Sequence, residues 1–180
     1  MKESSRGGNS IFEIAATYYQ VTGKRDLLDH AVQLADALYD DFKLHSPPFS
    51  GGERDAINCV QLYRVTHDKK HLDLAKHYLD IRGLEDSVNR SRHNQSYRPV
   101  LEQSEAVGHA VNCVSLMVSL IDVGTLTGMK EYFDAGYRMW QDAATRKCTL
   151  PVASVPRAMK DSARLTHFRI SRRIRKPAPC

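Results

Sequence analysis

The sequence is poor in cysteine and in long apolar runs, and each shortage excludes a class of protein. Its 180 residues include four cysteines, no two of which form a Cys-x-x-Cys pair. That spacing excludes a zinc finger or a dense disulfide framework recognisable from the sequence, and it favours a reducing compartment. No apolar run approaches the roughly 18 residues of a membrane span, and residues 1–8 lack the apolar core of a secretory signal. We therefore expect a cytoplasmic protein that makes no membrane contact.

The net charge of +5 is concentrated near the end of the sequence. Residues 157–176 hold eight Lys and Arg side chains against the single acidic Asp161, a net charge of 8 − 1 = +7. The rest of the chain therefore carries 5 − 7 = −2. The basic character belongs to this segment and not to the body of the protein.

A turn that contains threonine occurs three times in the body. Thr22, Thr66 and Thr127 are followed by Gly23, His67 and Gly128, respectively. Glycine suits the left-handed position that ends a helix, whereas His67 would be strained there. After each threonine, apolar or small residues recur at the sixth, ninth, twelfth and thirteenth positions, which is the spacing of one helix face. Each turn therefore predicts a helical hairpin.

The repeated hairpins predict an all-α fold. The predicted helices cover residues 10–22, 25–42, 54–66, 69–82, 103–126 and 129–146. The polar segments 46–52 and 84–99 are predicted to be loops. Each hairpin presents an apolar stripe that it cannot bury alone, so neighbouring hairpins must stack.

The predicted helix 103–126 carries a polar stripe beside its apolar face. Glu105, His109 and Asn112 are spaced four and three residues apart, as neighbours on one helix surface are. One interpretation is a solvated face with a Glu–His pair. The other is the lining of a polar cavity, in which a histidine beside a glutamate binds a hydroxylated ligand.

His67 and His71 are also four residues apart, like a pair of metal ligands. They flank charged residues at a predicted helix start, and no third ligand stands nearby in the sequence. We therefore expect both to be exposed and predict no metal site.

One continuous string points to a known family. Residues 97–111 read Tyr-Arg-Pro-Val-Leu-Glu-Gln-Ser-Glu-Ala-Val-Gly-His-Ala-Val. This string resembles a signature of glycoside hydrolase family 127, the β-L-arabinofuranosidase-like proteins, and the likeness covers roughly residues 9–147. The resemblance implies an (α/α)6 barrel with the sugar in its central cavity, a zinc-bound cysteine as nucleophile and a glutamate as acid/base. Carried over by position, His109 and Glu102 would face the sugar, with Glu105 beside them. The sequence departs from the family pattern at Tyr97, Asn112 and Gly52.

The resemblance also implies what this chain lacks. The family's cysteine nucleophile and zinc ligands lie after the segment that ends near Lys147, so we predict no catalytic residue and no metal site here. We expect part of a glycoside hydrolase of carbohydrate metabolism, a stack of hairpins that forms a partial (α/α)6 barrel and is inactive by itself. Its open inner wall could bind a sugar weakly or promote self-association. The alternative is a non-enzymatic helical-repeat scaffold that binds a protein or peptide.

Residues 148–180 break the pattern of the body. They lose helical periodicity and fill with Arg, Pro, Ser and Ala. If the codons are read from the last base of codon 147, suitable synonymous choices spell Met-Tyr-Pro-Thr-Gly-Gly-Val-Gly-Ser, which resembles the family's next motif. We therefore predict that this segment is translated out of frame and that its basic residues bind no nucleic acid. Sequencing the gene across codon 147 tests this.

The predicted organisation is a disordered start at 1–8, the hairpin body at 9–147 and a disordered tail at 148–180.

Overall fold

The computed structural model describes residues 10–45, 54–85 and 90–147, and in these ranges the protein is helical without strands. The predicted start at 1–8 and tail at 148–180 lie outside the described residues. The α-helices are α1 (Ser10–Thr22), α2 (Asp26–His45), α3 (Asp55–Thr66), α4 (Lys69–Asp80), α5 (Ala110–Thr127) and α6 (Lys130–Asp142). Two short elements complete the description, the 3-10 turn η1 (Val100–Glu102) and the π-turn η2 (Ala143–Lys147). The all-α prediction is confirmed.

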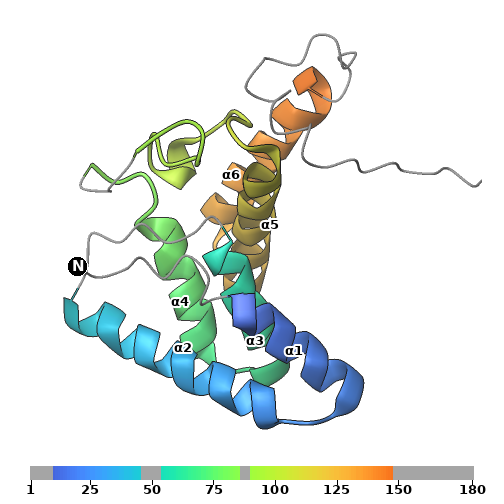
Figure 1. The fold of residues 1–180 in the computed structure, drawn as a ribbon. Helices are drawn as coiled ribbons and strands as arrows, with labels where there is room; N and C mark the ends of the chain where they lie inside the picture. The colour runs from blue at the N-terminus through green and yellow to red at the C-terminus, as the bar shows by residue number, and fades with distance from the viewer. Residues whose placement is uncertain (1–9, 46–53, 86–89, 148–180) are drawn as a thin grey trace, which may run out of the picture.

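The helices form three hairpins arranged in two layers (Figure 1). The first layer consists of α1, α3 and α5, with α3 packed between the other two. In the second layer α2 packs on α4, and α6 packs on α5. Each hairpin therefore contributes one helix to each layer, as stacked hairpins in an α/α barrel do.

The three threonine turns are built alike. In each, the threonine hydroxyl donates to the carbonyl four residues earlier, at 2.7 Å for Thr22, 3.0 Å for Thr66 and 2.6 Å for Thr127. The same hydroxyl accepts from the amide two residues later, at 3.2, 3.3 and 3.3 Å. One side chain therefore satisfies backbone groups on both sides of the helix end, where the helix itself leaves them unpaired.

The residue after each threonine adopts the left-handed conformation that the sequence predicted. The φ angles are +70° at Gly23, +56° at His67 and +74° at Gly128. His67 therefore carries the backbone strain that glycine avoids in the other two turns.

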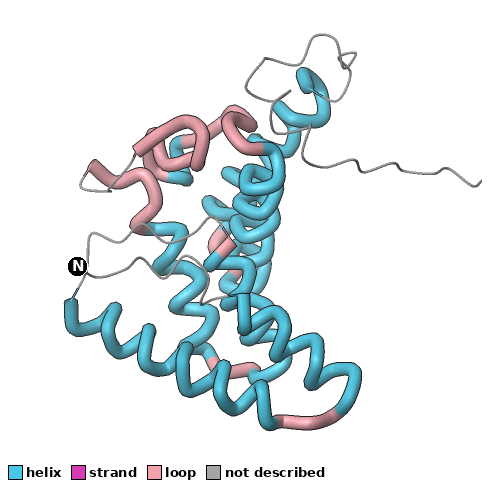
Figure 2. Tube along the Cα trace, viewed as in Figure 1, coloured by secondary structure: helices cyan, strands magenta, loops and turns pink. Residues whose placement is uncertain are grey.

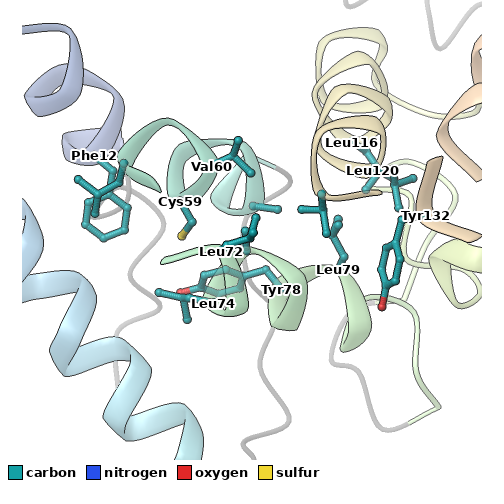
Figure 3. Packing of buried hydrophobic residues seen from close by; sticks show 14 of the residues in the cluster. Phe12, Cys59, Val60, Leu72, Leu74, Tyr78, Leu79, Leu116, Leu120 and Tyr132 are labelled. Atoms are coloured by element: carbon teal, nitrogen blue, oxygen red, sulfur yellow. The ribbon is translucent and has the colours of Figure 1, made fainter. Parts of the chain in front are cut away.

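One apolar core runs through all three hairpins. Figure 3 shows it extending from Phe12 on α1, past Val60 and Leu79, to Leu116 and Leu120 on α5. Small residues allow the helices to approach closely, as the repeat predicted. At Gly136, a Cβ atom would lie 2.9 Å from the Ile121 Cγ1 atom and 2.9 Å from the Met117 carbonyl oxygen.

The start of α5 differs from the prediction. The expected helix 103–126 begins only at Ala110, and residues 103–109 continue the loop that the sequence predicted to end at 99. Gly108 has φ +77°, and Gln103 is extended with φ −77° and ψ 137°. Neither conformation is helical. The loop lies over one end of α4 and α5 (Figure 2).

Helix α5 is also long and apolar enough to cross a membrane by length and composition, contrary to the expectation that no such run exists. A core helix of a stacked-hairpin protein meets the same two criteria. In the structure α5 packs on α3, α4 and α6, and Leu116, Leu120 and Val123 are buried there. Its apolar character is therefore accounted for by packing within the protein on these sides.

Candidate functional site

The loop of residues 90–109 and the first residue of α5 place several polar side chains at one end of the hairpin stack. His109 is the N-cap residue of α5, with φ −69° and ψ 121°. Its ring lies 5.9 Å from that of His93, edge to face. The Nδ1 atom of His109 is buried and has no hydrogen-bond partner among the described residues. A buried polar atom without a partner costs free energy that a bound ligand could recover.

Glu105 does not pair with His109, because the two residues do not share a helix. Instead, the Glu105 carboxylate accepts from Arg92 at 2.8 Å across the loop, and both side chains are more than half exposed. The predicted polar stripe of Glu105, His109 and Asn112 is therefore wrong as a helical pattern. What remains of the prediction is that these polar residues lie at or near the start of α5.

The Arg92 guanidinium also lies over an aromatic ring. Its Cζ atom is 4.9 Å from the centre of the Tyr97 ring, and the Arg98 Cζ atom is 5.0 Å from that centre. Burial raises the pKa of the Tyr97 hydroxyl, although the positive charges of Arg98 and Arg92 oppose the shift. Tyr97 therefore keeps its proton at neutral pH and can donate a hydrogen bond.

Glu102, the other predicted sugar contact, ends the short turn η1. Its side chain is exposed, and no hydrogen bond in the described part of the chain joins it to Glu105 or His109. The structure therefore places the three predicted site residues in one loop region, and among the described residues no hydrogen bond or ion pair joins their side chains to one another.

Two fully buried glutamines hold the loop in shape. The Gln95 Nε2 atom donates to the carbonyls of His93 at 2.9 Å and Val107 at 2.8 Å. The Gln103 Nε2 atom donates to the carbonyls of Gln95 at 2.9 Å and Arg98 at 2.8 Å. The amides therefore take the place of the regular backbone pairing that the loop lacks. Gln103 lies in the family-like string of residues 97–111 and Gln95 lies just before it, but a lone glutamine in a loop has no periodic pattern that would predict this role.

Two glycines allow the loop to approach other backbone segments. A Cβ atom at Gly108 would overlap the carbonyl oxygens of Arg92 and His93. At Gly83, just after α4, a Cβ atom would overlap the Arg98 carbonyl. Both glycines also have positive φ, +77° and +80°. The close contact at Gly108 is what brings His93 beside His109, whose amide donates to the His93 carbonyl at 2.9 Å.

Helix α6 braces the loop from the side. The Asp142 carboxylate accepts from the Ala106 amide at 3.0 Å. Arg138 donates to the Leu101 carbonyl at 2.8 Å. Side chains near the end of the last hairpin thus fix the loop that precedes it in sequence.

The described residues do not fit a cysteine-ligated zinc ion. Cys59 and Cys113 are buried in the apolar core, and burial together with Asp55 raises the pKa of the Cys59 thiol well above its ordinary value. A neutral buried thiol is a poor ligand and a poor nucleophile. Cys148 and Cys180 lie outside the described residues.

One other cluster in the described part of the chain has metal-binding residue types. Ligand atoms of Asp36, Asp68 and His71 lie within 4.8 Å of one another. Lys70 already pairs with Asp36 at 3.1 Å, and Asp68 accepts from the Lys70 amide as the N-cap of α4. His71 is buried, contrary to the prediction of exposure, because its Nδ1 atom lies 2.8 Å from the Thr66 hydroxyl of the turn. His67 is exposed as predicted. The cluster is accounted for by the structure of the turn.

Comparisons with known proteins agree on one family. Residues 9–154 match the family described as the β-L-arabinofuranosidase, GH127 catalytic domain. A curated relative, the non-reducing end β-L-arabinofuranosidase of Bifidobacterium longum subsp. longum, is 28% identical over 159 residues, covering 75% of this chain and 24% of its own.

Solved structures give the same result. A GH127 β-arabinofuranosidase is 35% identical with a TM-score of 0.68, covering 76% of this chain and 22% of that one. A GH127 β-L-arabinofuranosidase from Geobacillus stearothermophilus T6 is 24% identical with a TM-score of 0.69, covering 76% of this chain and 25% of that one. The chain thus spans about a quarter of the length of these relatives.

Proposed function

This chain belongs to the GH127 β-L-arabinofuranosidase catalytic-domain family, and from that premise we propose that its 90–109 loop and the start of α5 form part of the wall of a furanoside-binding site. Its three hairpins are part of an (α/α)6 barrel, the fold of its solved relatives. Relatives with this fold are named as β-L-arabinofuranosidases, which supports a β-L-arabinofuranoside as the ligand.

The observation that supports the proposal most directly is the state of His109. Its Nδ1 atom is buried and unpartnered, while the residue as a whole is only partly buried. A sugar hydroxyl can donate to or accept from an imidazole nitrogen, according to the tautomer. The edge-to-face contact with His93 orients the ring.

Neighbouring groups suit the other parts of a sugar. The Arg92–Glu105 pair offers both donors and acceptors at the exposed side of the loop. Tyr97 adds an aromatic face and a protonated hydroxyl. Sugar sites commonly combine such planar polar groups with an aromatic surface.

We propose that the intact parent hydrolyses the glycosidic bond and that the chain of 180 residues binds without hydrolysis. A retaining glycosidase needs a nucleophile within reach of the anomeric carbon. The two cysteines of the described ranges are buried in the apolar core. The contribution of this part of the barrel is to bind and orient the sugar.

Binding is tested by nuclear magnetic resonance. The full chain is titrated with methyl β-L-arabinofuranoside while the imidazole resonances are followed. We expect saturable shifts for the His93 and His109 rings, and loss of the His93 shift in His109→Ala. His30→Ala, at an exposed position on α2, is the matched control and should titrate like the unmodified chain. An unchanged His93 shift in His109→Ala would contradict the proposal.

Hydrolysis is tested separately with a chromogenic β-L-arabinofuranoside. We expect no release of the chromophore above background from the 180-residue chain. Robust turnover would contradict the view that the nucleophile is missing, without affecting the binding test.

A further inference from the structure

In the described part of the chain, the hairpin stack ends in two edges. Within the first layer α3 has a neighbour on each side, whereas α1 and α5 each have α3 as their only first-layer neighbour (Figure 1). In a complete α/α barrel every first-layer helix has two such neighbours, because the ring is closed. Within the described residues, α1 and α5 therefore each lack one partner.

The edge at α5 and α6 is apolar. On α5, Val111, Val114 and Val118 are 53%, 56% and 38% exposed and follow one another at helical spacing. On α6 the exposed aromatic rings of Phe133, Tyr137 and Trp140 stack in sequence, with centroids 6.1 and 5.5 Å apart. Exposed apolar stripes of this kind are typical of a surface that another protein segment covers.

The edge at α1 is apolar as well. Ile14, Tyr18 and Val21 are 58%, 37% and 80% exposed and recur four and three residues apart. Glu13, outside this stripe, pairs at 3.0 Å with Arg54 next to α3. The apolar stripe thus lies on a part of α1 that its contact with α3 does not use.

We propose that a second copy of this chain covers both edges, so that two copies close into one α/α toroid. The α1 edge of each copy would pack on the α5 edge of the other and supply the first-layer neighbour that α5 lacks. Three hairpins are half of the six hairpins of an (α/α)6 ring, so each copy covers half a turn. A head-to-tail contact that rotates by half a turn closes after two copies, and the resulting dimer has two-fold symmetry.

The geometry of this dimer has a consequence for the site. The two-fold axis coincides with the barrel axis, so both 90–109 loops lie at the same mouth of the toroid. Two identical seams form together, which helps the assembly to reach the roughly 1,200–2,000 Å² of buried surface typical of stable complexes. The inference rests on the barrel architecture and is independent of sugar binding.

The first test is the mass of the full chain by sedimentation equilibrium at micromolar concentration and physiological salt. We expect twice the chain mass of 20.4 kDa. Ile14→Glu and Val114→Glu should each give a monomer, because every seam of a homodimer contains both edges and a buried unpaired charge weakens association by on the order of a hundredfold or more. Leu84→Glu, at an exposed position after α4 and outside α1, α5 and α6, is the control and should stay dimeric.

The second test mixes the two edge variants. A mixed dimer of Ile14→Glu and Val114→Glu has one seam with both changes and one unchanged seam, so dimers should partly return on mixing. If instead the α1 edges of two copies paired with each other, or the α5 edges did, one of the two variants would remain fully dimeric by itself. That result, a monomeric unmodified chain, or a ladder of larger oligomers would each overturn the closed dimer.

Both substituted side chains are more than half exposed, so we expect the variants to fold. Circular dichroism checks their helicity. If one of them loses it, Tyr18→Glu or Val111→Glu takes its place on the same edge.

Discussion

The hairpins and the loop that covers their end are held together in different ways. The hairpins are stabilised by an apolar core and by threonine turns in which all the partners lie within a few residues in sequence. The loop of residues 90–109 is held by buried amides, close backbone contacts and braces from α6, which join residues up to 37 positions apart. The scaffold therefore tolerates local changes, whereas the loop depends on a few groups that have no substitute.

The largest expected effect distinguishes a glycine of the loop from one of the turns. Gly108→Ala should lower the free energy of unfolding by more than about 3 kcal/mol, because the new Cβ atom would overlap two carbonyl oxygens in addition to the strain of positive φ. Gly23→Ala adds a Cβ atom with nothing within 4 Å and should cost only the left-handed strain, about 1–2 kcal/mol. Urea denaturation measures both. Equal losses would show that the loop contact is not decisive.

A smaller effect is expected from the buried amide. Gln103→Ala removes the donor to the carbonyls of Gln95 and Arg98 and should cost about 2–3 kcal/mol, since both carbonyls would lose a buried partner. Hydrogen exchange should show the loss in residues 90–109 and leave α1 to α4 protected. Gln141→Ala, at an exposed position on α6, is the control. Faster exchange throughout the hairpins would mean that the two regions unfold as one unit.

The pH dependence of stability tests the turn between α3 and α4. Burial lowers the pKa of His71 below its ordinary value, against the opposing charges of Asp68 and Asp36, while Lys70 acts in the same direction as burial. Burial also lowers the pKa of His77 on α4. The unfolded chain therefore binds more protons than the folded one as pH falls through about 6.5, and stability should decrease there.

Thermal melts at pH 7.5 and 5.5 measure this decrease. His71→Gln should reduce the difference in Tm between the two pH values, and His30→Gln at its exposed position should leave it unchanged. A higher Tm at pH 5.5 than at pH 7.5 would contradict the proposed sign.

The smallest effect is expected from a single turn. Thr22→Ala removes one hydroxyl that bonds the Tyr18 carbonyl and the Lys24 amide at an exposed helix end, and should cost about 1 kcal/mol. Thr66→Ala should cost more, because its hydroxyl also contacts the buried His71 ring. Urea denaturation compares the two variants, and a larger loss at Thr22 would contradict this order.

The difference between the regions also explains what the sequence could predict. Helix limits from α1 to α4 agree with the structure within three residues, because apolar periodicity and the threonine turns are local signals. The left-handed φ of His67 could be foreseen for the same reason. Glycine occupies the corresponding position in the other two turns and indicates a left-handed residue there.

The start of α5 could not be predicted from local signals of this kind. Residues 103–109 contain apolar and polar residues at near-helical spacing, so the pattern alone predicted a helix from 103. What prevents the helix is the long-range network of Gln95, Gln103 and Asp142, whose partners are set only when the chain has folded. The Arg92 partner of Glu105 was missed for the same reason. His109 was identified correctly as a candidate, but its unpartnered nitrogen could be seen only in the structure.

The position of the single tryptophan gives the molecule an optical probe of its own. Trp140 is half exposed on α6 and stacks on Tyr137 with ring centroids 5.5 Å apart. Any helix that covers this surface would remove water from the indole and shift its fluorescence emission to shorter wavelength. Tryptophan fluorescence can therefore report the dissociation of such a complex when the protein is diluted. The measurement needs neither an added label nor a substrate.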